Sequence, residues 1–417
     1  MMPPPINSIK ALFARFRSGA DGNAAIIFAL VLLPILGIVG TAVDYSRASN
    51  VRSFLQNAAD TAAIAALNKF ETEDSVLLQL AKDTFNANLA QSHTSITSVP
   101  SIAQNGESVT VTANTSLHTI AMGILNVPSM QVAVTSTAVK APRVGPVCVL
   151  ALDPAAAGSI SLDGGASMTA TGCVVHANSR DEYALETNGS AVASADTFCA
   201  VGGYDGVGFT PWPTKNCSKA VDPYENLPAP TGLTCDHHSK QFNLGTHTAS
   251  PGVYCNGFAA HAHAEITLAP GLYVIKDGPL SLLAHSTITG NGVTFYLIGE
   301  GAVLDIKSQS NVILTAPTTG DYAGLVFVQD ASSSIGATSS VEGGGTIQIV
   351  GGIYLPTQTL DVGGEGTIGA TSPYMPIIAS NINFHGNASV SISVDAAAAG
   401  FLEVLPDVRA GSPRLIN

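Results

Sequence analysis

The clearest pattern in the chain is an uncharged apolar run near its start. No residue from Ala24 to Val43 carries a charge, and Asp21 and Asp44 lie on either side. A helix rises about 1.5 Å per residue, so about 20 residues span the bilayer core of about 30 Å. The apolar region of a signal peptide is shorter, about 7 to 15 residues. The run therefore predicts a transmembrane helix over residues 24–43, in preference to a cleaved signal or a buried soluble helix.

The charges before this run predict its orientation. Lys10, Arg15 and Arg17 precede it, and the first twenty residues contain no acid. Excess positive charge stays on the cytoplasmic side of a membrane. We therefore expect residues 1–23 to be a basic cytoplasmic tail. The protein is then single-pass, with its bulk exported and the lipid bilayer as a partner of the helix.

The helical pattern continues beyond the apolar run. Apolar and small residues recur there at intervals of three and four, at Val51, Leu55, Ala58, Ala62, Ala66 and Lys69. This spacing predicts one helix from Ala24 to Phe70 with a narrow stripe of small side chains. Small residues let helices approach closely. The stripe therefore predicts either packing within its own domain or pairing with another helix, and the pattern leaves both open.

Residues 44–140 are expected to combine this helix with a small α+β unit. Residues 73–90 have a helical period, whereas residues 108–116 and 130–139 alternate apolar with polar positions, as strands do. Proline and glycine then mark residues 141–146 as a linker.

From Val147 onward the pattern is one of short strands separated by glycine-rich turns. Five of these strands open on a glycine, at Gly252, Gly271, Gly292, Gly324 and Gly352. Repeats of short strands at such spacing are typical of stacked coils in a parallel β-helix. We expect a mainly β fold, with about ten coils over residues 147–405, a loop insertion at residues 201–240 and a C-terminal tail at residues 406–417.

The strand glycines also predict which side chains fill the coil. The first and third positions after each glycine are apolar, so they should share the inward face. Phe295 and Phe327 are then interior residues. Tyr254, Tyr273 and Tyr354 occupy the second position and should point outward.

Six cysteines lie in the region expected to be exported: Cys148, Cys173, Cys199, Cys217, Cys235 and Cys255. An even number in an oxidising compartment predicts three disulfides. Zinc sites favour close pairs such as C-x-x-C, and no two of these cysteines are that close. Sequential pairing would close short loops, but the sequence leaves the connectivity open.

The charge and the motifs argue against nucleic acid and cofactors. The net charge is −13, whereas phosphate binding needs a basic surface. Gly364, Gly366 and Gly369 match G-x-G-x-x-G, which indicates dinucleotide binding only between a strand and a helix. No helical pattern follows, so we interpret this stretch as a coil corner and expect no cofactor.

Three histidines are candidates for a metal site. Aligning the Ile-Thr pairs that follow them places His263 and His285 one coil apart, where they can stack, with His261 on the same strand face as His263. Imidazoles bind transition metals. The alternative, a polar ladder on a solvent-facing side, fits better because no acidic residues are placed to support metal ligands.

A polysaccharide-acting β-helix enzyme is the alternative to a structural protein. Glycoside hydrolysis needs two carboxylates facing each other across the sugar, but Asp305, Asp330 and Asp361 do not form a close pair in the sequence. Between residues 245 and 400 only Lys276 and Lys307 are positively charged. We therefore expect no enzymatic activity.

Residues 20 to about 70 resemble the N-terminal segment of TadE/TadG-like, Flp (tight adherence) pilus-assembly proteins. The matching features are a glycine before the apolar run, the Leu-Pro within it, and then DYSRA and QNAADTAA. The resemblance implies a structural or assembly component of a Tad-type pilus, or an associated surface adhesin. It also implies a bacterial inner membrane for the helix, with the bulk of the protein periplasmic or extracellular. Other pilus-assembly proteins are then the expected partners.

Two known features of such proteins are not expected here. Some carry a von Willebrand A domain with a D-x-S-x-S metal site, which Asp330, Ser332 and Ser334 match. That domain alternates strands and helices, and no helical pattern follows Ser334. Pilins of the same system are cleaved after a glycine with Glu five residues on, but Ile27 stands five residues after Gly22.

Overall fold

The computed structural model describes residues 22–68, 74–91, 96–105, 108–139, 143–307, 309–342, 344–365, 367–402, 405, 407–409 and 414–416. The chain divides into two compact units, Met1–Lys140 with Pro413–Asn417, and Ala141–Ser412. Lys10, Arg15 and Arg17 of the predicted tail lie outside the described residues, as do Lys69 and Phe70 at the predicted helix end.

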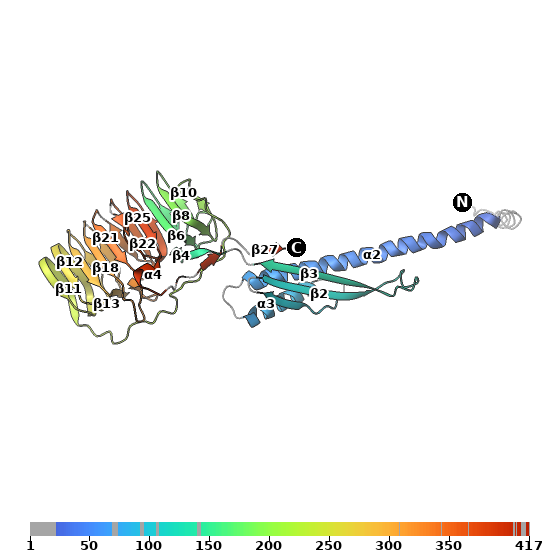
Figure 1. Ribbon diagram of the computed structural model, residues 1–417, viewed down its shortest axis with the longest axis horizontal. Coiled ribbons are helices and arrows are strands. Elements are labelled where there is room, and N and C mark those ends of the chain that lie inside the picture. Colours follow the sequence, from blue (N-terminus) through green and yellow to red (C-terminus); the bar gives the residue numbers. More distant parts are fainter. Residues whose placement is uncertain are drawn as a thin grey trace, which may run out of the picture. The chain divides into compact units, whose positions relative to one another are not determined.

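A single long helix, α2 (Gly22–Asn68), dominates the first unit (Figure 1). It continues through Pro34, so the predicted apolar run and the stripe beyond it form one element. The described stripe residues, Val51, Leu55, Ala58, Ala62 and Ala66, are all buried in the core of this unit. The stripe therefore packs within its own unit, which was one of the two open interpretations.

The rest of the first unit is a small α+β arrangement, as predicted. A second helix, α3 (Asp74–Ala90), accompanies an antiparallel sheet in the order β1-β2-β3-β27. These strands are β1 (Ser101–Asn105), β2 (Ser108–His118), β3 (Ser129–Val139) and β27 (Arg414–Ile416). Alternate residues of β2, such as Val109 and Val111, are buried in the core of this unit, where β2 packs against α2. The end of the predicted C-terminal tail thus supplies an edge strand, pairing Arg414 with Val139.

The second unit is a parallel β-helix whose coils have three sides. One coil consists of β13 (Gly271–Lys276), β14 (Leu280–Leu282) and β15 (Thr287–Asn291). Each of these strands pairs in parallel with its counterpart in the next coil, β16 (Val293–Ile298), β17 (Leu304–Ile306) and β18 (Asn311–Thr315).

The other elements of this unit are β4 (Arg143–Ala151), β5 (Ile160–Leu162), β6 (Ser167–Ala177), β7 (Leu185–Thr187), β8 (Val192–Ala200), β9 (Tyr204–Asp205), β10 (Phe209–Thr210), β11 (His237–Ala249), β12 (Gly252–Leu268), β19 (Leu325–Gln329), β20 (Thr338–Glu342), β21 (Thr346–Val350), β22 (Gly352–Gly363), β23 (Thr367–Ile368), β24 (Ile377–Phe384), β25 (Ser389–Ser393), α4 (Ala396–Ala399) and β26 (Asp407–Arg409).

The order of the coils along the axis differs from their order in the chain. Among the described residues the pairings stack ten coils in this sequence: 237–249, 252–268, 271–291, 293–315, 325–350, 352–368, 377–393, 147–171, 174–195 and 197–210. The first coil of the chain therefore stacks on the last one, through β4 against β24. The coil order departs from the chain order at this point, because residues 211–236 carry the chain from one end of the β-helix to the other.

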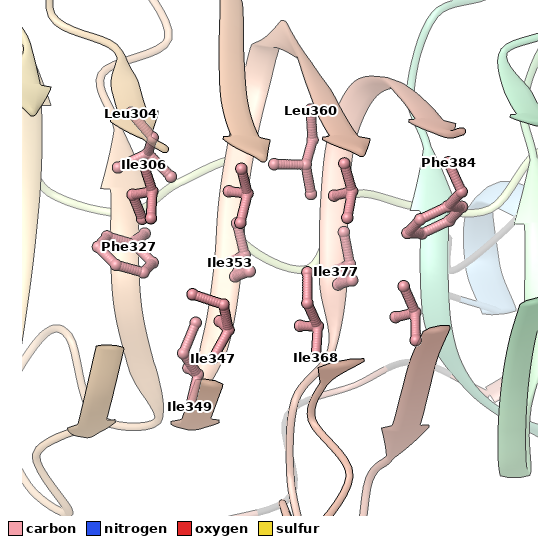
Figure 2. A pocket seen from close by; sticks show the side chains of 13 residues that line it. Leu304, Ile306, Phe327, Ile347, Ile349, Ile353, Leu360, Ile368, Ile377 and Phe384 are labelled. Atoms are coloured by element: carbon pink, nitrogen blue, oxygen red, sulfur yellow. The ribbon is translucent and has the colours of Figure 1, made fainter. Parts of the chain in front are cut away.

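The interior of the β-helix is packed with aliphatic and aromatic side chains (Figure 2). Phe295, Phe327, Ile353 and Ile377 follow one another in register down four coils. The space left among the residues of this region is about 10 Å³. One water molecule needs about 10–15 Å³, so this interior is a packed core and not a ligand site.

The predicted register is right for some coils and wrong for others. Phe295 and Phe327 pair directly, as expected. Tyr273, however, pairs with Phe295 and is fully buried, because Gly271 pairs with Val293 instead of with Gly292. Tyr254 pairs with Ile275 and is also buried. The glycines do not occupy equivalent positions in their coils. Aligning them therefore exchanged the inward and outward faces of β12 and β13 in the prediction.

Two predicted segment assignments also need correction. Residues 143–146, expected in the linker, begin β4 and pair with β26 in antiparallel fashion, Asp407 with Pro146. The predicted insertion at residues 201–240 contains β9, β10 and the start of β11. Both errors have one cause: proline and glycine within short strands look like turns when the pairing partner is far away in the sequence.

Candidate functional site

The first half of α2 exposes an unusually large apolar surface. Its exposed side chains are Ile26, Ile27, Phe28, Leu30, Val31, Leu32, Ile35, Leu36, Ile38, Val39 and Val43. Within the described residues α2 is the one helix long and apolar enough to cross a membrane, with a mean hydropathy of 2.7 over its most apolar window. A contiguous apolar surface of this size marks contact with lipid or with another protein.

A turn between β2 and β3 docks on α2 through Asp44. The Asp44 carboxylate accepts hydrogen bonds from the backbone N–H groups of Ile120 at 2.9 Å, Ala121 at 2.8 Å and Met122 at 2.9 Å. These donors, above all Met122 and Ile120, hold the pKa of Asp44 below its usual value. Only 2% of the Asp44 surface remains exposed. The side chain is therefore an anionic anchor point for the hairpin.

Gly40 makes this docking possible one turn earlier in the helix. A Cβ atom added at Gly40 would lie 2.2 Å from the Cβ of Ala121, closer than any real contact. At Gly37 an added Cβ would meet nothing within 4 Å. From the sequence, Asp44 could be recognised only as the first charged residue after the apolar run. Its role in binding the turn could not be predicted, because its hydrogen-bond partners lie more than seventy residues away.

Residues 211–236, which we term the connecting segment, cover one side of the β-helix. Asn178 exchanges two hydrogen bonds with the backbone of Ala220, at 3.0 and 2.8 Å. The hydroxyl of Tyr354 donates to Asp222 at 2.9 Å. That of Tyr322 donates to the carbonyl of Pro228 at 2.7 Å. The segment is thus bonded to several coils along its length.

The three predicted disulfides are present and pair the cysteines sequentially. Cys199–Cys217 and Cys235–Cys255 fasten the two ends of the connecting segment to the coils. Cys148–Cys173 links neighbouring coils at the point where the chain enters the β-helix. No described cysteine is free. Two of the three disulfides therefore hold the connecting segment, through which the coil order departs from the chain order.

The histidines occupy a corner of the β-helix. The rings of His263 and His285 stack, with centroids 5.0 Å apart and planes at 5°. Both residues have positive φ, 60° and 59°, and the chain turns at Ala262 and His263. His261 and His263 are therefore not neighbours on one flat strand face, contrary to expectation. Across the described residues, no group of three or more His, Cys, Asp or Glu side chains is placed to hold a metal ion.

The carboxylates considered for catalysis are all engaged in local contacts. Asp305 pairs with Lys307 at 3.1 Å, and Asp361 with His385 at 3.0 Å. Asp305 and Asp361 share one column, since both pair with Ser340 of the coil between them. The sequence did not reveal this alignment, because the coil lengths differ.

Asp330 belongs to a turn and not to a von Willebrand A domain. Burial opposes its ionisation, but hydrogen bonds from Ser332, Tyr296 and Ser333 outweigh that effect and lower its pKa. A strand, β20, follows this turn where that domain would have a helix. The G-x-G-x-x-G match likewise lies at a coil corner, with Gly364 and Gly369 at φ of 91° and 71°. Gly366 is outside the described residues.

Comparison with known families bears on α2 alone. Residues 22–69 match the model of the TadE/G-like Flp pilus-assembly family. This TadE/G-like segment coincides with α2, Gly22–Asn68, and with nothing in the β-helix. No curated protein and no solved structure matches the chain. The pilus-assembly relationship therefore rests on the helix, whereas the β-helix is interpreted from its own residues.

Proposed function

We propose that the protein is a membrane-anchored structural component of a Tad-type pilus-assembly system, which carries a rigid β-helix outside the cytoplasm. The observation that carries the proposal is the coincidence of the TadE/G-like segment with an exposed apolar helix. The apolar half of α2 is long enough for a bilayer, and its other half is the core of a folded unit.

The proposed topology places the N-terminus in the cytoplasm and both folded units in the periplasm or outside the cell. Lys10, Arg15 and Arg17 favour this orientation. Three disulfides in the β-helix fit an oxidising compartment. The membrane and other proteins of the pilus system are then the partners.

The β-helix acts in this proposal as a spacer or an adhesive surface, and not as an enzyme. Its interior is filled, and Asp305, Asp330 and Asp361 are engaged within the coil. Glycoside hydrolysis needs one carboxyl as acid and one as base or nucleophile, both facing the substrate. Asp305 and Asp361 share one column, but each is paired with a neighbouring basic side chain, so the polysaccharide enzyme is not proposed.

Complementation of a strain that lacks the protein tests this function. The variants are Leu32→Arg, within the apolar run, and Leu402→Arg, at an exposed leucine of the β-helix unit. Arginine at the centre of a membrane helix costs roughly 2.5–3.5 kcal/mol in insertion. We expect the deletion to reduce surface pili, Leu402→Arg to restore them, and Leu32→Arg to fail. Normal piliation in the deletion strain, or full restoration by Leu32→Arg, would contradict the proposal.

A further inference from the structure

The turn that docks on Asp44 is apolar on its outside. Residues 119–129, which we term the hairpin tip, carry no charged side chain. Ile120 is 67% exposed, Ile124 87% and Leu125 62%, and Val127 is also exposed. These four large apolar side chains lie at the end of one hairpin, where the described residues of this unit leave them exposed.

The position of the hairpin tip is fixed relative to α2, because both belong to the first unit. Asp44 is the first charged residue after the apolar run, and it binds the start of the tip. Ala121 packs on Gly40, one helical turn inside the run. Figure 1 shows β2 and β3 running beside α2 toward its N-terminal half. The tip therefore lies level with the end of the predicted membrane span.

The backbone of the tip is suited to a region poor in water. Asp44 binds three of its N–H groups. Those of Ile124, Leu125, Asn126 and Val127 donate to carbonyls of Ala121, Met122 and Gly123. Asn126 closes this turn at φ of 64°. Backbone polar groups must be satisfied internally where lipid replaces water, and most of those in the tip are.

We propose that the hairpin tip inserts into the outer interface of the bilayer beside α2, as a second membrane contact of this protein. The occupant of the apolar surface is the lipid at the boundary between headgroups and acyl chains. Apolar side chains at that depth bind by burying their area, without any specific partner. The inference rests on the proposed membrane anchor. It adds that the first unit is held against the membrane at two points, which restricts its tilt.

Lipid is favoured over a protein partner by continuity. The uncharged run of exposed apolar side chains on α2 reaches Val43, directly before Asp44. The hairpin tip, which binds Asp44, places further exposed apolar side chains at this level. A protein interface would carry a polar rim around the apolar centre. The hairpin tip has no charged side chain from Thr119 to Ser129, and its Thr119 hydroxyl donates within the turn, to the carbonyl of Val127.

Nitroxide labels on the full chain can test this inference. Single cysteines are introduced at Ile124 or Leu125 in the tip, at Ile38 in the anchor, or at Val99, which is 77% exposed before β1. The native cysteines are paired, so the new thiol is the one that reacts. The protein is reconstituted in vesicles of phosphatidylethanolamine and phosphatidylglycerol. Collisions of each label with oxygen, which enriches in lipid, and with a water-soluble nickel chelate are then measured.

The expected result is that labels at Ile124 and Leu125 collide with oxygen and lose collisions with nickel, as the Ile38 label does. The Val99 label should collide freely with nickel. Nickel access at both tip positions, with Ile38 in lipid, overturns the inference and leaves the anchor intact. Protection of the tip from both reagents indicates a protein partner or a second copy, and also overturns it. Nickel access at Ile38 overturns the proposed anchor itself.

Discussion

The hydroxyl of Tyr354 donates a hydrogen bond of 2.9 Å to the carboxylate of Asp222, which lies 132 residues earlier in the chain. Tyr354 belongs to β22 and Asp222 to the connecting segment, and the ring of Tyr224 packs edge-on against Tyr354 at 5.3 Å. Burial raises the pKa of Asp222, while the backbone N–H of Tyr224 and the Tyr354 hydroxyl oppose that effect. This contact fastens the connecting segment to the middle of the β-helix.

Replacing Tyr354 by Phe should therefore destabilise the β-helix unit. The partly buried Asp222 carboxylate would lose one donor, at a cost of about 1–2 kcal/mol in the free energy of unfolding. Denaturant unfolding of the full chain in detergent, followed through Trp212, measures this cost. Tyr45→Phe, at an exposed tyrosine of α2, is the matched control and should stay within about 0.5 kcal/mol. Equal effects of the two variants would contradict the role of this hydrogen bond.

Tyr273 and Phe295 should be equally sensitive to truncation. They are aligned in neighbouring coils with ring centroids 5.3 Å apart, and both are fully buried. Emptying a core aromatic site costs about 3–5 kcal/mol, so Tyr273→Ala and Phe295→Ala should both fall in that range. The Tyr273 hydroxyl also donates to the carbonyl of Ala249 at 2.8 Å, and the alanine variant loses this hydrogen bond as well. A Tyr273→Ala variant of near wild-type stability would support the register inferred from the glycines instead.

The Cys199–Cys217 disulfide should control one end of the connecting segment. Replacing both cysteines by Ser is expected to cost about 2–4 kcal/mol and to speed hydrogen exchange near Cys217. The matched control replaces Cys148 and Cys173, which join two coils and lie outside the connecting segment. That pair should lower overall stability without a selective rise in exchange over residues 211–236. Identical exchange maps for the two variants would refute the fastening role.

His176 should make the β-helix sensitive to acid. It is fully buried in β6, and this burial lowers its pKa to about 4. Between about pH 4 and the ordinary value of about 6.5, the unfolded chain binds a proton that the folded chain does not. Stability is therefore lost as the pH falls through this window, by up to about 3 kcal/mol. His176→Leu should remove this loss in unfolding experiments at several pH values, whereas an unchanged pH profile would exclude His176 as its source.

Gly40→Ala should displace the hairpin tip from α2. The new methyl group would overlap the Cβ of Ala121, whereas Gly37→Ala meets open space. Hydrogen exchange at the amides of Ile120, Ala121 and Met122 should accelerate in the first variant and stay unchanged in the second. Adding Ala121→Gly to Gly40→Ala removes the overlap and should restore protection. Failure of this double variant to recover would show that Gly40 acts in another way.

The sequence was sufficient to predict the elements that depend on local patterns. Composition alone reveals the apolar run up to Val43 and the even number of cysteines. The helical period of the sequence reveals the stripe that includes Leu55 and Ala62. Stacked coils could also be predicted, because short apolar strands separated by glycine-rich turns recur from Val147 onward.

The rest depends on contacts between residues far apart in the chain. No local signal shows that β4 pairs with β24, since each is a short apolar strand that fits any neighbouring coil. Gly271 pairs with Val293 and not with Gly292, the glycine that opens the next strand in the sequence. The glycines therefore do not mark the register between neighbouring coils. Nothing in the sequence around Asp44 indicates that its carboxylate binds three backbone N–H groups of residues 120–122. Side-chain partners across such distances could not be predicted from periodicity.

Photocrosslinking through the anchor in cells that assemble Flp pili tests the central claim most directly. A photoreactive amino acid is placed at Phe28 or Ile38, on the exposed apolar half of α2, and at Val99 as an exposed apolar control outside it. Crosslinked partners are identified by mass spectrometry. The account predicts adducts with lipid and with identified pilus-assembly proteins from Phe28 and Ile38, but not from Val99. Anchor positions that yield neither lipid adducts nor any pilus-assembly protein would contradict it.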